Sequence, residues 1–244
     1  MPFVVSGLRR FEQNLVQQPI QQPVLYRDDH LVVVDKPSGL AVHRSERLQG
    51  PVSMTLARDT VGARVFPVHR LDGGTSGVLV YALDPGSAER LQEQFRNGTV
   101  HKSYLALTRG VPAEGRLDHP VPVARKSAER RGASTTFRVL GVGYLSGAER
   151  AWGWVEARPH TGRLHQIRRH LKHLSCPIVG DVHYGKGDVN RLFRERFDLH
   201  RLALHAASIA FDHPTTGEWV IFEAALPEDV ERIVEELGIS NPSL

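Results

Sequence analysis

The nine residues HRLDGGTSG, at positions 69–77, lie between two apolar segments and place the carboxylate of Asp72 on a glycine-rich loop. Arg70 precedes this carboxylate by two positions. Asp-Gly and Gly-Gly are also ordinary turn dipeptides, so these residues alone favour a hairpin turn over a catalytic loop. In either case we expect a strand on each side of the loop.

Short segments rich in β-branched or aromatic residues extend along much of the chain, and glycine- and proline-containing turn signals bound several of them. We expect strands at residues 31–35, 78–83, 103–108, 151–158, 207–213 and 219–224. Helical signals are fewer, at residues 87–96, 163–174 and 228–237. Because strands and helices do not alternate regularly, a doubly wound parallel sheet is disfavoured. The pattern predicts an α+β fold with a mixed or antiparallel central sheet flanked by a few helices.

The two ends of the chain differ in character. Residues 11–23 are rich in glutamine, contain two prolines and have little periodicity. We therefore interpret residues 1–22 as a leader of unknown role and residues 23–244 as one folded domain. Residues 113–134 are rich in proline, glycine and charge, which predicts an excursion between core strands.

Composition narrows the class of protein. The net charge of +4 and the pI of about 9.4 permit a polyanionic partner without requiring one. Cys176 is the only cysteine, which excludes an intramolecular disulfide and a cysteine-rich metal site and favours a reducing compartment. No apolar run approaches the roughly 20 residues that a spanning helix needs. We expect a cytoplasmic protein without a membrane partner, and no obligate protein partner is evident.

A basic helix is expected at residues 163–174. One apolar stripe at helical spacing runs along it, formed by Leu164, Ile167, Leu171 and Leu174. Arg168 lies beside this stripe and should point partly inward, where a guanidinium needs an anionic partner. Arg169, Lys172 and His173 fall on the other side, where they could contact phosphates or form a solvated basic face.

Two further patterns argue against other chemistries. The chain has 13 histidines but no His-Glu-x-x-His motif, and histidines beside arginines disfavour a divalent cation, so no metal site is predicted. Residues 180–187 resemble a phosphate-binding loop, but Gly187 stands where a Ser or Thr hydroxyl is needed. The segment after it is not an obvious helix, and we exclude nucleotide hydrolysis.

Several blocks, in order, resemble the RluA-type pseudouridine synthases. Residues 69–77 resemble the family signature, residues 35–39 its opening block, and Lys102 with Tyr104 and Ala106 its tyrosine block. Residues 162–170, with 177–181 and 204–206 beyond them, resemble its arginine block. The resemblance spans roughly residues 24–225 and implies the pseudouridine synthase fold, with residues 23–244 as its catalytic domain.

The resemblance implies roles for individual residues. Asp72 would be the catalytic aspartate, Arg168 would pair with it, and Tyr104 would stack on the target base. Arg70 would fill the space left by the flipped nucleotide. We expect the remaining substrate contacts from His69, Thr75, Lys102, Arg163, His165, Gln166, Arg169 and Lys172. Tyr104 is also a candidate to remove the proton from carbon 5, although simple strand packing is an alternative.

The implied reaction is an isomerisation of uridine to pseudouridine in a structured RNA, which requires no cofactor. Within the family the likeness is greatest to members that modify a uridine in the acceptor stem of tRNA, at uridine-65. Large-subunit ribosomal RNA is the alternative substrate. Two other classes stay open: a catalytically inert RNA-binding protein with the same fold and, less favoured, a histidine-based metallohydrolase.

Overall fold

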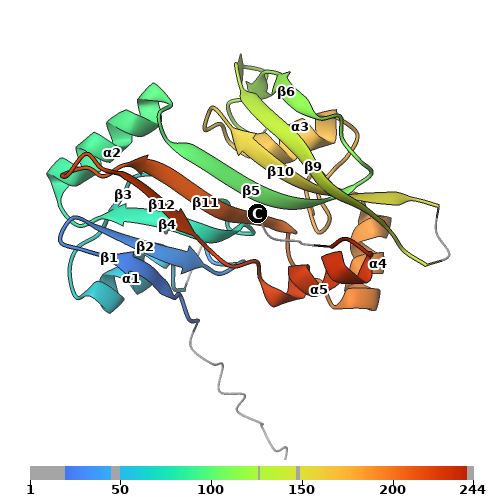
Figure 1. Cartoon of the computed structure of the whole chain (residues 1–244), viewed down its shortest axis with the longest axis horizontal. Helices are drawn as coiled ribbons and strands as arrows, with labels where there is room; N and C mark the ends of the chain where they lie inside the picture. Colours follow the sequence, from blue (N-terminus) through green and yellow to red (C-terminus); the bar gives the residue numbers. More distant parts are fainter. Residues whose placement is uncertain (1–19, 45–49, 126, 147–148, 241–244) are drawn as a thin grey trace, which may run out of the picture.

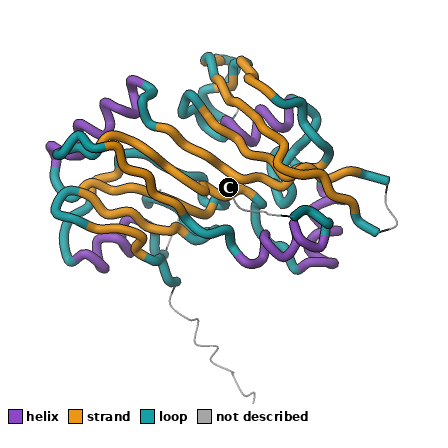
Figure 2. Tube along the Cα trace, in the orientation of Figure 1, coloured by secondary structure: helices purple, strands orange, loops and turns teal. Residues whose placement is uncertain are grey.

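The structure is a computed structural model that describes residues 20–44, 50–125, 127–146 and 149–240. Most of the predicted leader, residues 1–22, lies outside the described residues. Within these ranges ten strands form one sheet, and helices lie against it (Figure 1). Figure 2 shows the strands as one continuous curved layer with helices at its borders. No helix in the described part of the chain is both long enough and apolar enough to cross a bilayer.

The main path through the sheet runs β1-β2-β4-β11-β5-β10-β9-β6. In chain order its strands are β1 (Val24–Arg27), β2 (Leu31–Lys36), β4 (Ser76–Ala82), β5 (His101–Arg109), β6 (Gly115–Asp118), β9 (Ser134–Tyr144), β10 (Ala151–Pro159) and β11 (Leu204–Asp212). Two short strands join it from the side, β3 (Phe66–Pro67) on β4 and β12 (Trp219–Glu223) on β11. A separate hairpin is formed by β7 (Val121–Pro122) and β8 (Arg130–Arg131).

The described helices are α1 (Ser53–Val61), α2 (Pro85–Asn97), α3 (Gln166–His173), α4 (Gly187–Phe197) and α5 (Glu228–Glu236). Their ends follow from local chemistry. The side chain of Asp84 accepts from the backbone N–H of Ser87 at the start of α2, and Gly98 ends that helix in the left-handed conformation. This cap fixes the end of α2 beside the start of β5, where the site described below lies.

The sheet is mixed, because β4 and β11 pair in parallel while the other strands on the path pair antiparallel. The parallel pair joins Ser76 to His205 and Gly77 to Ala206. Gly77 has a φ of 107°, and a Cβ at this position would lie 2.2 Å from the Ala206 carbonyl oxygen. Only glycine allows β4 and β11 to approach this closely. The predicted α+β class with a mixed sheet is confirmed.

In the half of the sheet that contains β2 and β4, helices cover both faces. Val33 packs in one cluster with Leu91 of α2, whereas Val32 and Val34 pack in another with Ala57 of α1. β4 is therefore buried along its whole length. Each such buried valine or leucine contributes about 1.5–3 kcal/mol to folding. A third cluster packs α3, α4 and α5 against the half of the sheet that contains β5, β9 and β10.

The predicted strands and two of the predicted helices are found within a few residues of their expected bounds. The helix expected at 163–174 begins later, at Gln166, because residues 163–165 form the loop that leads into it. The interpretation that no helix follows Gly187 is wrong, since α4 begins there and buries Val189, Phe193 and Phe197 at helical spacing. The predicted excursion at 113–134 is confirmed, because it holds β6 and the β7–β8 hairpin between β5 and β9.

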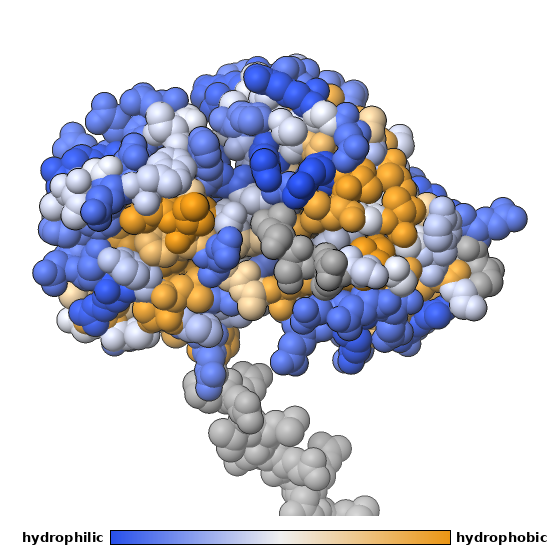
Figure 3. All heavy atoms as spheres, viewed as in Figure 1, coloured by the Kyte–Doolittle hydropathy of each residue, from blue (hydrophilic) through white to orange (hydrophobic). Residues whose placement is uncertain are grey.

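One face of the molecule carries apolar surface. Figure 3 shows apolar areas on the left, over the region of β12, and on the right, each bordered by hydrophilic side chains. Exposed apolar residues of the described chain include Tyr26 of β1, Trp219 and Ile221 of β12, and Val142 and Tyr144 of β9. The cavity described next is lined by other residues, from α2, β5 and the loop before α3.

Candidate active site

The loop that carries Asp72 is fixed by a buried lysine. The N–H of Thr75 donates to the Asp72 carbonyl at 3.0 Å, which closes a turn over the two glycines. Lys36, fully buried at the end of β2, donates its Nζ to the Gly73 carbonyl at 3.2 Å and also to the carbonyls of Pro37 and Leu40. The turn interpretation of residues 69–77 is therefore confirmed, and this turn, held in place by Lys36, presents the Asp72 carboxylate.

Asp72 and Arg168 form an ion pair across the site. Arg168 Nη1 donates to Asp72 Oδ2 at 2.8 Å, although the two residues are 96 positions apart in the sequence. The Arg168 side chain is 8% exposed and the Asp72 side chain 19% exposed, so the pair is largely shielded from water. The predicted inward orientation of Arg168 is confirmed. A contacting cation favours the ionised form of a carboxylate in such surroundings.

Asp181 holds Arg168 from a second direction. Its Oδ2 accepts from Arg168 Nε at 2.8 Å and its Oδ1 from Arg168 Nη2 at 2.9 Å, a bidentate arrangement. Burial alone would raise the pKa of Asp181, but the bonds and charge of Arg168 and two backbone N–H groups lower it below its ordinary value. Burial alone would lower the pKa of Arg168, and the two carboxylates raise it instead. The guanidinium is therefore charged and fixed in orientation.

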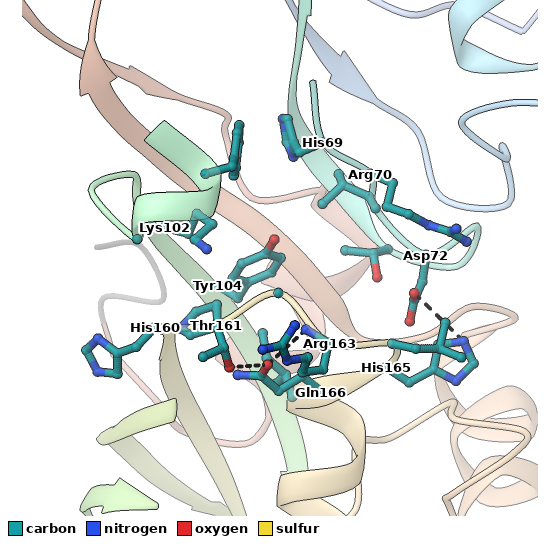
Figure 4. Close-up of a pocket in the computed structure, with 18 of the residues that line it drawn as sticks. His69, Arg70, Asp72, Lys102, Tyr104, His160, Thr161, Arg163, His165 and Gln166 are labelled. Atoms are coloured by element: carbon teal, nitrogen blue, oxygen red, sulfur yellow. Dashed lines mark hydrogen bonds and ion pairs between the residues drawn. The ribbon is translucent and has the colours of Figure 1, made fainter. Parts of the chain in front are cut away.

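A cavity of about 920 Å³ opens in front of Asp72. Tyr104 and Lys102 of β5 line it, together with Thr75, Arg70 and His69 of the Asp72 loop (Figure 4). Burial raises the pKa of the Tyr104 phenol, and the charge of Asp72 raises it further, so the phenol is neutral at physiological pH. Burial lowers the pKa of Lys102. The volume lies within the range of small-ligand pockets.

His165 completes the surroundings of the carboxylate. Its Nε2 lies 3.8 Å from Asp72 Oδ1, and its Nδ1 lies 3.0 Å from the hydroxyl of Tyr184. The dashed line between Asp72 and His165 in Figure 4 marks the first of these contacts. Burial lowers the pKa of His165, the positive charges of Arg168 and Arg169 lower it further, and Asp72 opposes them. A neutral imidazole therefore faces Asp72 at neutral pH.

Gln166 lines the cavity, but its amide is engaged by the protein. Oε1 accepts from the Thr161 hydroxyl at 2.6 Å and from the Arg163 backbone N–H at 3.0 Å (Figure 4). Nε2 donates to Ser134 and Thr135 of β9 at 2.9 Å each. Gln166 thus ties the loop before α3 to the sheet, and it holds the cavity wall in place.

The three remaining basic candidates on or before α3 differ in their positions. Arg163 is exposed and lines the cavity, as predicted for a substrate contact, whereas Lys172 is exposed but lies outside the lining. The prediction that Arg169 lies on an outer face is wrong: it is 9% exposed and donates to Tyr184 and to the carbonyls of Pro122 and Ala124. The β7–β8 hairpin segment covers Arg169, which a helical pattern alone does not reveal.

His69, another predicted substrate contact, is held by contacts within the protein. Its Nε2 accepts the backbone N–H of Val80 at 3.0 Å, and its ring stacks on Phe95 of α2 at 5.0 Å. Burial, followed by the charge of Lys102, lowers the pKa of His69 to about 3, so the ring is neutral. His69 therefore connects the Asp72 loop to β4 and α2.

Three site residues were absent from the sequence-based set: Asp181, Tyr184 and Arg96. Asp181 and Tyr184 follow α3 in the chain and contact Arg168 and His165 there, and Arg96 lines the cavity from the end of α2. The sequence did indicate that Arg168 needs an anionic partner. We assigned that partner to Asp72 alone, although Asp181 is a second one. In the described part of the chain, no three His, Cys, Asp or Glu side chains gather where they could share a metal ion.

Known proteins are similar to this chain in sequence and in fold. The model of the RNA pseudouridylate synthase family matches residues 30–173. The tRNA pseudouridine synthase C of Vibrio parahaemolyticus is 38% identical over 232 residues, which cover 88% of this chain and 94% of that protein. The corresponding protein of Vibrio cholerae is 39% identical, with 88% and 95% covered.

A solved structure agrees with these matches. Human RNA Pseudouridylate Synthase Domain Containing 4 superposes with a TM-score of 0.73 at 29% identity, covering 90% of this chain and 94% of that one. Asp72, Tyr104 and Arg168 all lie within the residues that the family model matches. The family resemblance read from the sequence is thereby confirmed, and the chain belongs to the RNA pseudouridylate synthase family.

Proposed function

We propose that this chain is an RNA pseudouridine synthase that isomerises one uridine in the acceptor stem of tRNA, at uridine-65. The observation that carries the proposal is the Asp72 carboxylate, held by Arg168 at 2.8 Å and directed at a cavity that Tyr104 lines. A module that only binds RNA has no use for a carboxylate beside bound phosphates. The names of the bacterial relatives support tRNA as the substrate.

The chemistry needs few groups. The bond between ribose C1′ and uracil N1 breaks, the base turns, and C1′ joins C5; the C5 proton leaves and N1 gains one, so product and substrate are isomers. An ionised carboxylate at the sugar–base junction can act as a nucleophile or as a base toward the sugar. Asp72 fills that role, with Arg168 in hydrogen-bond contact with it.

Tyr104 contacts the uracil of the bound nucleotide in this proposal. The raised pKa keeps the Tyr104 phenol protonated in the resting site, where it is not available to accept a proton, so stacking on the uracil is its main contribution. Removal of the C5 proton by the phenolate would require a path through water or a transient shift in its pKa. Lys102, from the same strand, lies beside the same cavity and can contact the uridine's phosphate.

Entry of the nucleotide requires base flipping. The reacting atoms of a stem uridine are enclosed by the helix, so the nucleotide must leave the stack to reach Asp72. Arg70 is exposed at the rim of the cavity and is suited to fill the gap. Arg96, His160 and Arg163 line the same opening and supply further positive or polar contacts for the backbone. A cytoplasmic location is part of the same proposal, because tRNA is the substrate.

The test uses tRNA transcripts labelled with tritium at C5 of uridine. Wild-type protein should release tritium, and Asp72→Asn, which is nearly isosteric, should release none while still folding and binding the transcript. Asp59→Asn, which changes an exposed carboxylate on α1, is the matched control and should behave as wild type. Release by Asp72→Asn at the wild-type rate would remove Asp72 from the mechanism.

The substrate is tested separately. Pseudouridine would be mapped across total RNA from cells with and without this protein. A single difference at uridine-65 of tRNA supports the proposal. A difference confined to large-subunit ribosomal RNA would replace tRNA with the alternative substrate.

A further inference from the structure

The hydroxyl of Tyr184 joins two side chains of the site. Arg169 Nε lies 2.9 Å from it and His165 Nδ1 lies 3.0 Å from it. Arginine is only a donor, so the Tyr184 oxygen accepts from Arg169 and its own O–H is free to donate to His165 Nδ1. The carbonyls of Pro122 and Ala124 hold the other nitrogens of Arg169 and fix the direction of this bond. His165 consequently carries its proton on Nε2.

The backbone of His165 is unusual for its place in the fold. It is the N-cap of α3, yet its φ of 51° and ψ of 31° lie in the left-handed region, whereas N-caps are normally extended. The other described non-glycine residues with positive φ, Ser175 and Asp198, lie at helix C-terminal ends, where this conformation is common. His165 makes no capping bond with its side chain. The conformation directs the imidazole toward Asp72 and away from the helix.

The two oxygens of Asp72 face different groups. Oδ2 accepts from Arg168 at 2.8 Å, and Oδ1 lies 3.8 Å from the protonated Nε2 of His165. This distance is too long for a hydrogen bond. Catalytic hydrogen bonds are often long in unliganded enzymes and shorten when substrate fills the cavity.

We infer that Tyr184 is a positioning residue which, through His165, holds an N–H donor toward Oδ1 of Asp72 while Arg168 holds Oδ2. The inference rests on the proposed function and extends it to a residue beyond the 30–173 segment that the family model matches. With both oxygens oriented, the carboxylate presents one fixed edge to the sugar. Tyr184 acts on the rate of the chemical step and leaves RNA binding unchanged, because its hydroxyl is directed at His165 and Arg169.

The ionisable groups around His165 come from three segments. They are Asp72 of the catalytic loop, Arg168 and Arg169 of α3, and Asp181, His183 and Tyr184 of the loop after it. His183 in turn is contacted by Arg125 at 3.2 Å. Loss of the Tyr184 hydroxyl would remove a donor that stabilises neutral His165, so the pKa of His165 should rise by about half a unit or more.

The first test needs no RNA. Nitrogen-15 NMR of the full chain, with His165 assigned from a His165→Gln variant, reports which ring nitrogen carries the proton between pH 6 and 8. Nε2 is expected to carry it, and Tyr184→Phe should raise the pKa of His165. Tyr184→Phe keeps the aromatic ring, over which the guanidinium of Arg168 lies at 5.1 Å. A proton on Nδ1 in the wild type, or an unchanged titration in the variant, would overturn the inference.

The second test is a double-mutant cycle on single-turnover tritium release. Tyr184→Phe should slow release about fivefold, the equivalent of one hydrogen bond, with RNA affinity within twofold of wild type. In a His165→Gln background, where the amide donor does not depend on Tyr184, the same change should cost less than twofold. Tyr144→Phe, on an exposed phenol of β9, is the matched control. Equal losses in both backgrounds would make the hydroxyl purely structural, whereas absence of release by the wild type would refute only the proposed function.

Discussion

Asp181 accepts two hydrogen bonds from Arg168, at 2.8 and 2.9 Å, and these leave Nη1 as the nitrogen that reaches Asp72. The guanidinium therefore cannot rotate toward or away from the Asp72 carboxylate without breaking a bidentate contact. Asp181 is fully buried and receives backbone N–H groups from His183 and Tyr184 as well. The geometry of the Asp72–Arg168 pair is thus set by a residue that does not line the cavity.

Asp181→Asn should lower activity more than about tenfold and cost about 2 kcal/mol of stability, because an amide nitrogen would oppose one guanidinium N–H. Tritium release and urea unfolding would measure the two effects. Asp59→Asn removes a carboxylate from an exposed pair with Arg58 and should cost less than about 0.5 kcal/mol. Equal effects of the two substitutions would show that burial of the Asp181 pair is unimportant.

Arg168→Met should abolish turnover and cost about 3–5 kcal/mol, because two carboxylates would lose their shared partner. Adding Asp181→Leu to this variant should restore much of the stability, since an apolar pair replaces a buried charge, but none of the activity. Thermal unfolding and tritium release would separate the two outcomes. Recovery of activity in the double variant would contradict the role given to Arg168.

Lys36→Met should destabilise the protein by about 2–3 kcal/mol, since three carbonyl oxygens would lose a buried donor. For a chain of this size that corresponds to a fall in Tm of about 4–12 °C. Lys186→Met, at an exposed lysine before α4, provides the comparison in differential scanning calorimetry. A melting temperature equal to that of the comparison variant would mean that the turn at Gly73 does not depend on Lys36.

Low pH should reduce the free energy of unfolding, because Asp181 becomes protonated. Its folded pKa lies below the ordinary value of 3.8, so the unfolded chain binds protons more readily and the stability from this group is lost as pH falls through the folded pKa. Above about pH 5 the contribution is fully present. The difference in unfolding free energy between wild type and Asp181→Asn should therefore shrink between pH 5 and pH 2.5. A constant difference would assign the stabilisation to packing.

RNA affinity should fall steeply with salt, because arginines line the mouth of the cavity. Arg163→Gln and Arg96→Gln should each reduce the slope of log Kd against log salt by about one, which filter binding of tRNA at several salt concentrations would measure. Arg58→Gln, on the exposed face of α1, should leave the slope unchanged. Unchanged slopes for all three variants would place the RNA elsewhere on the surface.

Periodicity and turn chemistry were sufficient to predict the strands and the inward side chain of Arg168, because both depend on local patterns. The prediction that Arg168 pairs with Asp72 came from the family resemblance, since no local pattern connects residues that are 96 positions apart. Neither source predicted Asp181 as the second partner. The resemblance included that residue without giving it a role.

The errors have a common physical cause. Arg169 was assigned to an outer face, but the β7–β8 hairpin, remote in the sequence, covers that face. The segment of α4 was not recognised as a helix, whereas its stability comes from burying Val189, Phe193 and Phe197 in the core. Exposure and helix formation at these points are decided by tertiary packing, which one-dimensional patterns do not contain.

The position of β11 in the sheet has a consequence for synthesis of the chain. This strand leaves the ribosome after β4 and β5, which precede it by about a hundred residues, yet it lies between them in the sheet. Until residues 204–212 emerge, β4 and β5 expose unpaired edges in a nascent polypeptide, a condition that invites aggregation. We therefore expect slow, late folding and a dependence on chaperones during translation, with stop codons before Leu204 yielding insoluble product.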